Sequence, residues 1–333
     1  MENAPTSRES PHRNLLSNGE GTISILIPMR NAEAWITSTL KLCLTQRNVD
    51  FEIIIIDDGS TDRSVEVVRS MNDSRIRIIP GPQKGISAAF NAGLAEAKGQ
   101  FLARCDADDL YPLDRLAWQV EFLKSHPDFG AVCGHFATID EHNELISDHY
   151  EEFPAEEITQ ILRDGKSRSH MCAYLFRTDI LRRIGGCREW FLTSEDADLQ
   201  FRLAETTRIW FEPKRAYLYR LHSTSITHQQ KAAERKFFER KARDFQLQRQ
   251  QTGKDALQLG TPPPVEADPS APHPLPAKQQ IQDLLISKSW REHKLGAKSL
   301  ALRTGWRAMR RDASRAAAWK SLFALLLKPS RKQ

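Results

Sequence analysis

The fold is decided by residues 51–60, which read FEIIIIDDGS. The apolar, mostly β-branched run at the start predicts a short strand buried on both faces, as in a parallel sheet. Asp57 and Asp58 stand at the carboxyl end of that strand. The glycine that follows permits a tight turn, and Ser60 is suited to cap a helix over residues 61–71. The stretch therefore predicts a strand, a ligand-binding turn and a helix.

Two further groups of acids stand where an apolar run ends or a helix begins. Residues 100–105 predict a second strand, which runs into Asp106 and Asp108. Glu195 and Asp196 open a predicted helix, where free backbone N–H groups favour negative charge. Open α/β sheets bind ligands at the carboxyl ends of their parallel strands, so we expect these acids to gather at one edge of a sheet.

Strand and helix patterns alternate around these acids, which predicts βαβ units and a mostly parallel sheet flanked by helices. The expected strands are 22–27, 51–56, 75–79, 100–105, 131–139, 170–176, 208–211 and 216–221. The expected helices are 34–44, 61–71, 86–97, 113–125, 156–162, 178–184 and 195–204, the last with Ser194 as its N-cap.

Charge divides the chain into an acidic body and a basic tail. Residues 231–333 carry 22 Lys/Arg against 9 Asp/Glu, a net of +13, so with +5 overall the first 230 residues sum to −8. The expected parts are a disordered lead-in over 1–20, an α/β domain over 21–230, a helical extension over 231–260, a Pro-rich linker over 261–280 and a basic helical tail over 281–333.

The lack of a recognisable targeting signal and the pattern of cysteines lead us to expect a cytoplasmic protein. The lead-in has no apolar core of the kind that signal peptides have, and no stretch reaches the ~20 apolar residues that span a bilayer. The five cysteines are odd in number and form no CxxC pair, so we expect reduced, buried thiols rather than disulfides or zinc ligands. They are Cys43, Cys105, Cys133, Cys172 and Cys187.

The spacing of Asp106 and Asp108 suits a divalent cation. A D-x-D pair in a loop can place two carboxylates on Mg²⁺ or Mn²⁺, which keeps waters and shares its other positions with substrate phosphates. A nucleotide diphosphate leaving group fits that need. A single acidic turn is more often merely exposed to solvent, but three acid groups at strand ends or a helix start favour a ligand-binding site.

The chain has no GxxxxGK[ST] and no GxGxxG after its first strand, which excludes a P-loop and a dinucleotide fold.

Five segments together resemble a family 2 glycosyltransferase of GT-A fold. They are residues 25–31 (ILIPMRN), 56–62 (IDDGSTD), 84–93 (KGISAAFNAG), 106–109 (DADD) and 194–199 (SEDADL), in the order and spacing of the family over roughly residues 20–228. The resemblance implies an inverting transfer of a hexosyl or N-acetylhexosaminyl group from a nucleotide-sugar, most often a UDP-sugar, with Mn²⁺ or Mg²⁺ as cofactor.

The resemblance also implies roles for single residues. His222 lies in residues 219–223 (YRLHS), similar to the Y-R-x-H segment that closes over the diphosphate, although an ordinary strand-end histidine is an equal alternative. Trp190 is a candidate for stacking on an acceptor sugar, with anchoring of its loop to the core as the alternative. The implied sets are Asp196 as general base with Glu195 beside it, Pro28, Asn31, Asp57, Asp58, Lys84 and Asp106 for the nucleotide-sugar, and Asp108, Asp106 and His222 for the metal.

We therefore expect an enzyme at the cytoplasmic face of the plasma membrane that acts on a glycan or lipid-linked acceptor in cell-surface polysaccharide or lipopolysaccharide synthesis. The alternative is a non-catalytic sugar-nucleotide or glycan-binding module, which would not need Asp58, Asp108 and Asp196 together. The tail places basic and apolar residues at helical spacing, so we expect it to meet an anionic membrane surface rather than nucleic acid. Packing of the tail on the acidic body is the other possibility.

Overall fold

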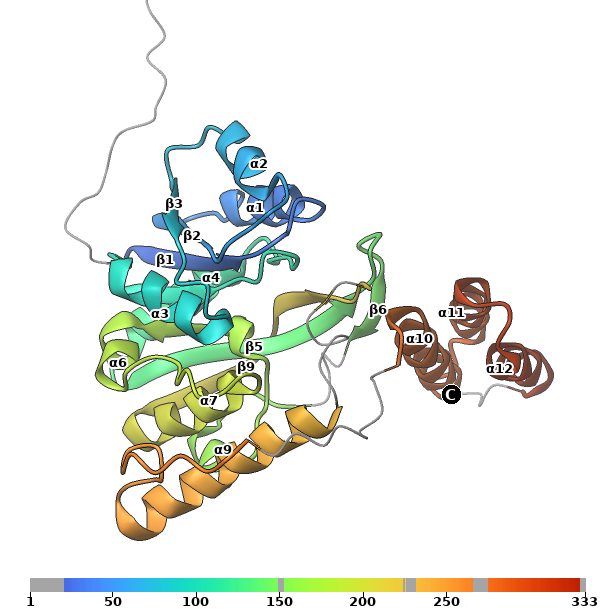
Figure 1. Cartoon of the computed structure of the whole chain (residues 1–333). Coiled ribbons are helices and arrows are strands. Elements are labelled where there is room, and N and C mark those ends of the chain that lie inside the picture. The colour runs from blue at the N-terminus through green and yellow to red at the C-terminus, as the bar shows by residue number, and fades with distance from the viewer. Residues whose placement is uncertain (1–20, 149–152, 224, 226–231, 266–274, 330–333) are drawn as a thin grey trace, which may run out of the picture.

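The computed structural model describes residues 21–148, 153–223, 225, 232–265 and 275–329 of the 333. The predicted lead-in over 1–20 and the middle of the predicted linker lie outside the described residues. A central sheet is flanked by helices, and three helices at the C-terminal end stand beside it (Figure 1). The mixed α/β architecture with a helical C-terminal extension agrees with the predicted fold class.

The described strands form one sheet in the order β3-β2-β1-β4-β8-β5-β9-β7, with β6 paired to β5. Strands β3, β2, β1 and β4 run parallel, as do β5 and β9. Strand β8 is antiparallel to β4 and β5, β6 to β5, and β7 to β9, so only part of the sheet is parallel. The strands are β1 Ile23–Met29, β2 Phe51–Asp57, β3 Ile76–Pro80, β4 Phe101–Arg104, β5 Phe129–Ile139, β6 Leu145–Asp148, β7 Glu156–Glu157, β8 Tyr174–Arg177 and β9 Arg208–Arg220.

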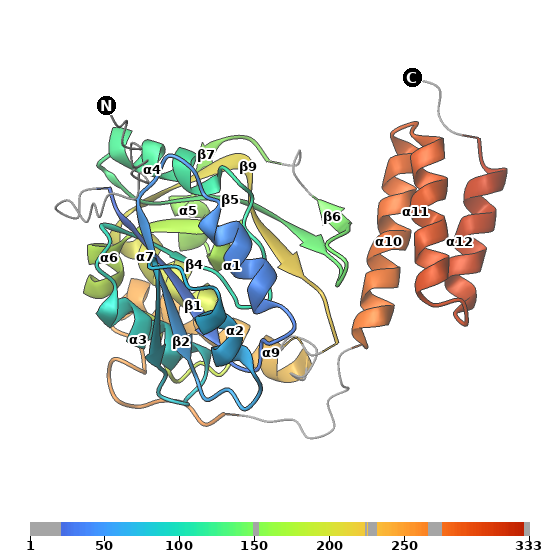
Figure 2. The ribbon, with the colours of Figure 1, turned by 90° about the horizontal axis from the view of Figure 1, so that it is seen from above.

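Helices cover both faces of the sheet and follow the predicted order. The long helix α9 lies along α7 beneath the sheet, and α10 to α12 form a separate group next to β6 (Figures 1 and 2). The helices are α1 Ile36–Leu44, α2 Ser64–Ser70, α3 Ile86–Glu96, α4 Arg115–Ser125, α5 Thr159–Arg163, α6 Thr178–Arg183, α7 Glu195–Thr206, α9 Ala232–Thr252, α10 Ala277–Lys294, α11 Lys298–Arg311 and α12 Ala316–Leu327, with a short 3₁₀ turn at Met171–Ala173.

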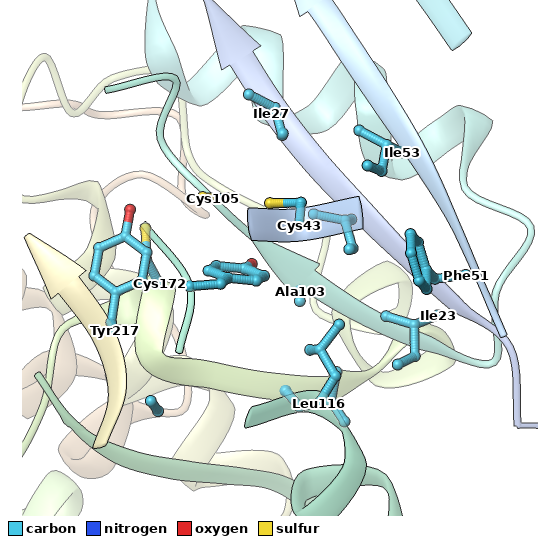
Figure 3. Packing of buried hydrophobic residues seen from close by; sticks show 14 of the residues in the cluster. Ile23, Ile27, Cys43, Phe51, Ile53, Ala103, Cys105, Leu116, Cys172 and Tyr217 are labelled. Atoms are coloured by element: carbon cyan, nitrogen blue, oxygen red, sulfur yellow. The ribbon is translucent and has the colours of Figure 1, made fainter. Parts of the chain in front are cut away.

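The core has two halves because side chains alternate across the strands. Ile23 and Ile53 belong to the half that packs against α1 and α4, whereas Leu26 and Ile54 belong to the half that packs against α3, α6 and α7. Figure 3 shows the first half, with Leu116 and the thiol of Cys43 over the sheet. All five cysteines are free and buried, as predicted. A strand buried on both faces explains the unbroken apolar run at residues 53–56.

Some local predictions were wrong. The two strands expected at 208–211 and 216–221 are one strand, β9. It pairs with β5 along its length, and the pairing continues through several shifts of register. The helix expected over 156–162 is divided into β7 and α5. Helix α2 begins at Ser64 rather than near Ser60, and the Ser64 N–H is accepted by the Asp62 carboxylate at 3.0 Å. These are tertiary pairings and turn geometries that a local pattern does not contain.

The basic tail packs on the acidic body. Ile281 and Leu285 of α10 share a buried cluster with Ile146 of β6 and Leu221. Arg307 of α11 pairs with Glu144 at 2.7 Å, and Arg311 with Glu141 at 2.5 Å. Helix α10 begins at Ala277, inside the range expected as linker. The structure thus supports packing on the body for α10 and α11.

The described residues contain no helix whose length and apolar character would let it cross a lipid bilayer.

Leu285→Ala tests whether the tail is part of the folded unit. The side chain is buried between the tail and the body, so its truncation is expected to lower the free energy of unfolding by about 2–5 kcal/mol. Leu300→Ala is the matched control, because Leu300 is exposed on α11. Thermal and denaturant unfolding measure both; equal stability of the two variants would contradict the packing.

Candidate functional site

Strand register places the first two acid groups at one edge of the sheet. Asp57 is level with Met29 at the end of β1 and with Pro80 at the end of β3. Cys105, which directly precedes the second group, donates its N–H to the carbonyl of Leu26 at 2.9 Å. The loops after β1, β2 and β4 therefore leave the sheet side by side.

The loop after β1 is fastened to the loop after β2 through Asn31. Its backbone has a positive φ of 52°, a conformation that asparagine tolerates better than most residues. The Asn31 side-chain oxygen accepts from the Thr61 N–H at 2.7 Å, and its own N–H donates to the Ser60 hydroxyl at 3.1 Å. Asp57 accepts from the Ser60 N–H at 3.1 Å. Pro28 lies buried in β1 just before this loop.

Asp58 holds the loop that precedes α3. Its buried carboxylate accepts from the backbone N–H of Gln83 at 2.6 Å and of Gly85 at 3.0 Å. A Cβ on Gly81 would lie 2.8 Å from the carboxylate, so glycine is needed for this close approach. Lys84 is exposed between the two donors. The structure thus gives Asp58 a loop-holding role at the edge where the nucleotide was predicted.

Asp108 and His222 meet in the loop after β4. The Asp108 carboxylate lies 2.8 Å from His222 Nε2, and the His222 ring lies 4.8 Å from the Trp35 ring. Residues far apart in the chain, at the end of β4 and beyond the end of β9, are thereby brought together. No three His, Cys, Asp or Glu side chains of the described residues are grouped to hold a metal ion; Asp108 and His222 form a pair of two possible donors.

Asp109 is the most enclosed acid of this loop. It accepts from the Tyr217 hydroxyl at 2.6 Å and from the Arg220 N–H at 2.6 Å. The same hydroxyl accepts from the Asp106 N–H at 3.0 Å. Burial raises the pKa of Asp109 well above its usual value, and the nearby charges of Asp108 and Asp106 add to this. Asp109 therefore attaches this loop to β9.

Arg104 joins the second acid group to the third. Its Nε donates to Asp106 at 2.7 Å, and its Nη1 donates to Glu195 at 3.1 Å. Burial alone would raise the pKa of Asp106, but the charges of Arg104 and His170 and the hydrogen bonds to the carboxylate together outweigh it, so the pKa lies below its usual value. Burial raises the pKa of Glu195; Arg104 opposes that shift and Asp196 adds to it, leaving the pKa raised. Arg104 thus brings together the second and third of the three acid groups, whereas the first is placed at the same edge by strand register.

Asp196 occupies the first turn of α7 in a more open setting. Its carboxylate accepts from the Ala197 N–H at 2.9 Å, and the residue is half-buried, whereas Glu195 is buried. Ser194 stands at the N-cap as predicted, but its φ is 59° and its side chain makes no capping hydrogen bond.

Trp190 is not brought to the acids as an open stacking surface. Its ring packs in a cluster with Phe191 and with Phe237, Phe238 and Phe245 of α9, at ring separations of 5.1 to 6.2 Å. This placement agrees with the alternative of a loop anchor.

Sequence reasoning missed Arg104 and Tyr217. One signal for Arg104 was present, since a charged residue inside an apolar strand needs a buried counter-charge. Tyr217 gave no such signal, because a tyrosine in a strand is ordinary.

Comparison with known proteins identifies the relatives of this chain. Residues 24–185 match the family model "Glycosyl transferase family 2". An uncharacterized glycosyltransferase of Haemophilus influenzae is 38% identical over 104 residues, which is 30% of this chain and 42% of the relative. The chondroitin synthase of Pasteurella multocida is 31% identical over 214 residues, which is 61% of this chain and 21% of the synthase. The chain thus spans less than half the length of these relatives.

Solved structures share the fold. A crystal structure of S. aureus TarS 1–349 in complex with UDP has a TM-score of 0.56 and 16% sequence identity, and the match covers 91% of this chain and 90% of that one. At that identity the likeness concerns the fold alone.

Proposed function

We propose that the chain, whose residues 24–185 match the model of glycosyl transferase family 2, is an inverting glycosyltransferase. It moves a hexosyl or N-acetylhexosaminyl group from a UDP-sugar to a hydroxyl of a glycan or lipid-linked acceptor, in cell-surface polysaccharide or lipopolysaccharide synthesis. The observation that carries this proposal is the Arg104 link, which brings Asp106 and Glu195 into one site. The chondroitin synthase relative and the TarS fold solved with UDP support the sugar-nucleotide class.

The nucleotide end of the donor is proposed to lie at the loops after β1 and β2. Asn31, Asp57 and Asp58 fix the shapes of these loops through the hydrogen bonds described above. Lys84 offers an exposed cation in the next loop. Arg220 is buried, and among the described residues its Nη2 has no hydrogen-bond partner. A buried guanidinium N–H without a partner favours an anionic ligand beside Asp108, which suits a diphosphate.

A divalent metal fits the Asp108–His222 pair. Mg²⁺ and Mn²⁺ are usually held by one or two protein groups plus substrate phosphates and water, so a two-donor set agrees with an ion that arrives with the nucleotide. The 2.8 Å between the two donor atoms is close to the ~3.0 Å expected for neighbouring ligands of an octahedral ion with bonds of ~2.1 Å. When bound, the ion would act as a Lewis acid for the departing diphosphate. Asp106, held by Arg104, would support the loop.

Asp196 is the proposed general base. A sugar hydroxyl is a weak nucleophile, so a carboxylate must take its proton as it attacks the anomeric carbon. Glu195 is engaged by Arg104, whereas Asp196 is half-buried and more open, which favours Asp196 for proton transfer. The acids of the β4 loop stand on a different element from the base. That separation suits inversion, in which nucleophile and leaving group occupy opposite sides of the sugar.

A non-catalytic sugar-nucleotide or glycan-binding module remains the alternative proposal. Asp196, within the set of Asp58, Asp108 and Asp196, distinguishes the two proposals, because a module that only binds has no use for a proton acceptor next to the donor loop.

Asp108→Asn tests the metal assignment. Loss of one anionic oxygen is expected to weaken UDP binding in Mn²⁺ or Mg²⁺ by about 10-fold or more and to lower UDP release across a panel of UDP-sugars. Asp114→Asn is the control, because Asp114 lies outside the site at the start of α4. Full activity of the unmodified protein in excess EDTA would refute the metal dependence.

Asp196→Asn separates binding from chemistry. The substitution keeps the shape but removes the proton acceptor, so kcat should fall by at least ~10²-fold while UDP affinity changes little. Steady-state kinetics and calorimetric titration with UDP measure the two effects. If Glu195→Gln, which keeps the shape of its side chain, lowers kcat far more than Asp196→Asn does, the base has been assigned to the wrong carboxylate.

We also propose that α12 contacts an anionic membrane surface and keeps the enzyme peripheral at the inner face of the plasma membrane. Trp319, Phe323 and Leu326 are exposed by 37%, 57% and 51%, and the first two rings stack 6.2 Å apart. They share one helical face, and the tail from residue 284 onward carries 13 Lys/Arg against 2 Asp/Glu. Each basic residue near an anionic surface contributes about 1 kcal/mol.

Sedimentation with phosphatidylglycerol vesicles tests the membrane contact. The full-length protein should pellet at low salt and be released at high salt, because the attraction is screened over ~8 Å at physiological ionic strength. Phe323→Glu should abolish pelleting, whereas Leu259→Glu, at an exposed leucine after α9, should not. Equal pelleting of the two variants would remove α12 from the contact.

A further inference from the structure

We propose that Arg104 is a positioning residue that holds the donor-side acid loop after β4 and the first turn of α7 at a fixed separation. The inference rests on the proposed function, since it assigns a role inside that site. Arg104 touches neither donor nor acceptor in this account. It acts through Asp106 on one side and Glu195 on the other.

The geometry requires an arginine. One guanidinium reaches Asp106 through Nε and Glu195 through Nη1, at 2.7 and 3.1 Å, and a third contact joins Nη1 to the sulfur of Met171 at 3.8 Å. The planar fork donates in several fixed directions, whereas a lysine ammonium is a single point on a flexible chain. Lysine would keep the charge but not both contacts.

Arg104 is itself held in place by its surroundings. Arg104 is the last residue of β4, and its carbonyl accepts from the buried Tyr111 hydroxyl at 2.7 Å. The side chain is only 6% exposed. Removing one partner of such a buried ion pair leaves an uncompensated charge, so movement of either acid away from Arg104 is unfavourable.

The first turn of α7 needs an external restraint. Ser194 has a left-handed backbone, uncommon for a residue other than glycine, and its side chain does not cap the helix. Glu195, the first residue of α7, is held from outside by Arg104. Asp196 is the next residue, so the contact that fixes Glu195 also fixes the base. A displacement of about 1 Å can reduce turnover about 10²-fold, which makes such a restraint consequential.

A double-mutant cycle on the full-length protein tests the role. Arg104→Met and Glu195→Gln should each lower kcat for UDP release from the best UDP-sugar by about 10-fold or more. Glu195→Gln leaves the Arg104–Asp106 contact in place, so it should change UDP affinity in Mn²⁺ by less than about 3-fold. The double variant should be no slower than the slower single variant, because both break one contact. Arg104→Lys should not restore turnover. Hydrogen exchange at residues 195–199 should quicken in Arg104→Met without nucleotide.

Arg115→Met is the matched control. Arg115 is also fully buried and donates to the carbonyls of Cys172 and Tyr174 at 2.5 and 2.8 Å. Its loss should lower stability while exchange at 195–199 stays as in the unmodified protein at a temperature where both are folded.

Three results would overturn the inference. Multiplicative effects in the double variant, full turnover of Arg104→Lys, or unchanged exchange at 195–199 would each show that Arg104 does not position α7. If the unmodified protein binds UDP and releases it from a UDP-sugar while one of these occurs, only the Arg104 role fails. If it neither binds UDP nor turns over any UDP-sugar, the proposed function fails and the Arg104 role with it.

Discussion

Buried charge at the carboxyl edge of the sheet is the constraint on which the rest of the structure depends. Asp109 and Glu195 are buried, and a buried acid without a partner is costly, by several kcal/mol when it is ionised. Compensation comes from distant parts of the chain: the Tyr217 hydroxyl and the Arg220 N–H for Asp109, and the Arg104 guanidinium for Glu195. Strands β4 and β9 and helix α7 must therefore meet at one point.

This constraint divides the acids into two kinds. Asp58, Asp106 and Glu195 are engaged by backbone N–H groups or by Arg104, so they hold loops in shape. Asp108 and Asp196 belong to the same acid groups and are the carboxylates proposed for the chemistry. In the loop after β4, Asp106 and Asp109 hold the backbone in place beside Asp108. At the start of α7, Glu195 does so beside Asp196. Preorganisation of this kind lets a site stabilise developing charge without rearranging as the reaction proceeds.

The sequence predicted what is local and missed what is distant. The strand that ends at Asp57 and the helix that begins at Glu195 were predicted because an apolar run, a turn and an acid lie together in the chain. The partner of Arg104 lies 91 residues away, and nothing in a local pattern specifies that distance. The antiparallel insertion of β8 between β4 and β5 is likewise set by tertiary pairing. The roles given to single residues remain predictions.

The central claim is that the loops after β1, β2 and β4 and the segment after β9 form one sugar-nucleotide site. Hydrogen–deuterium exchange of the full-length protein, with and without UDP and Mn²⁺, tests it most directly. We expect simultaneous protection of residues 28–31, 57–60, 106–109 and 219–223, with α10 unchanged. Protection confined to one of these segments, or found in α10 instead, would contradict it.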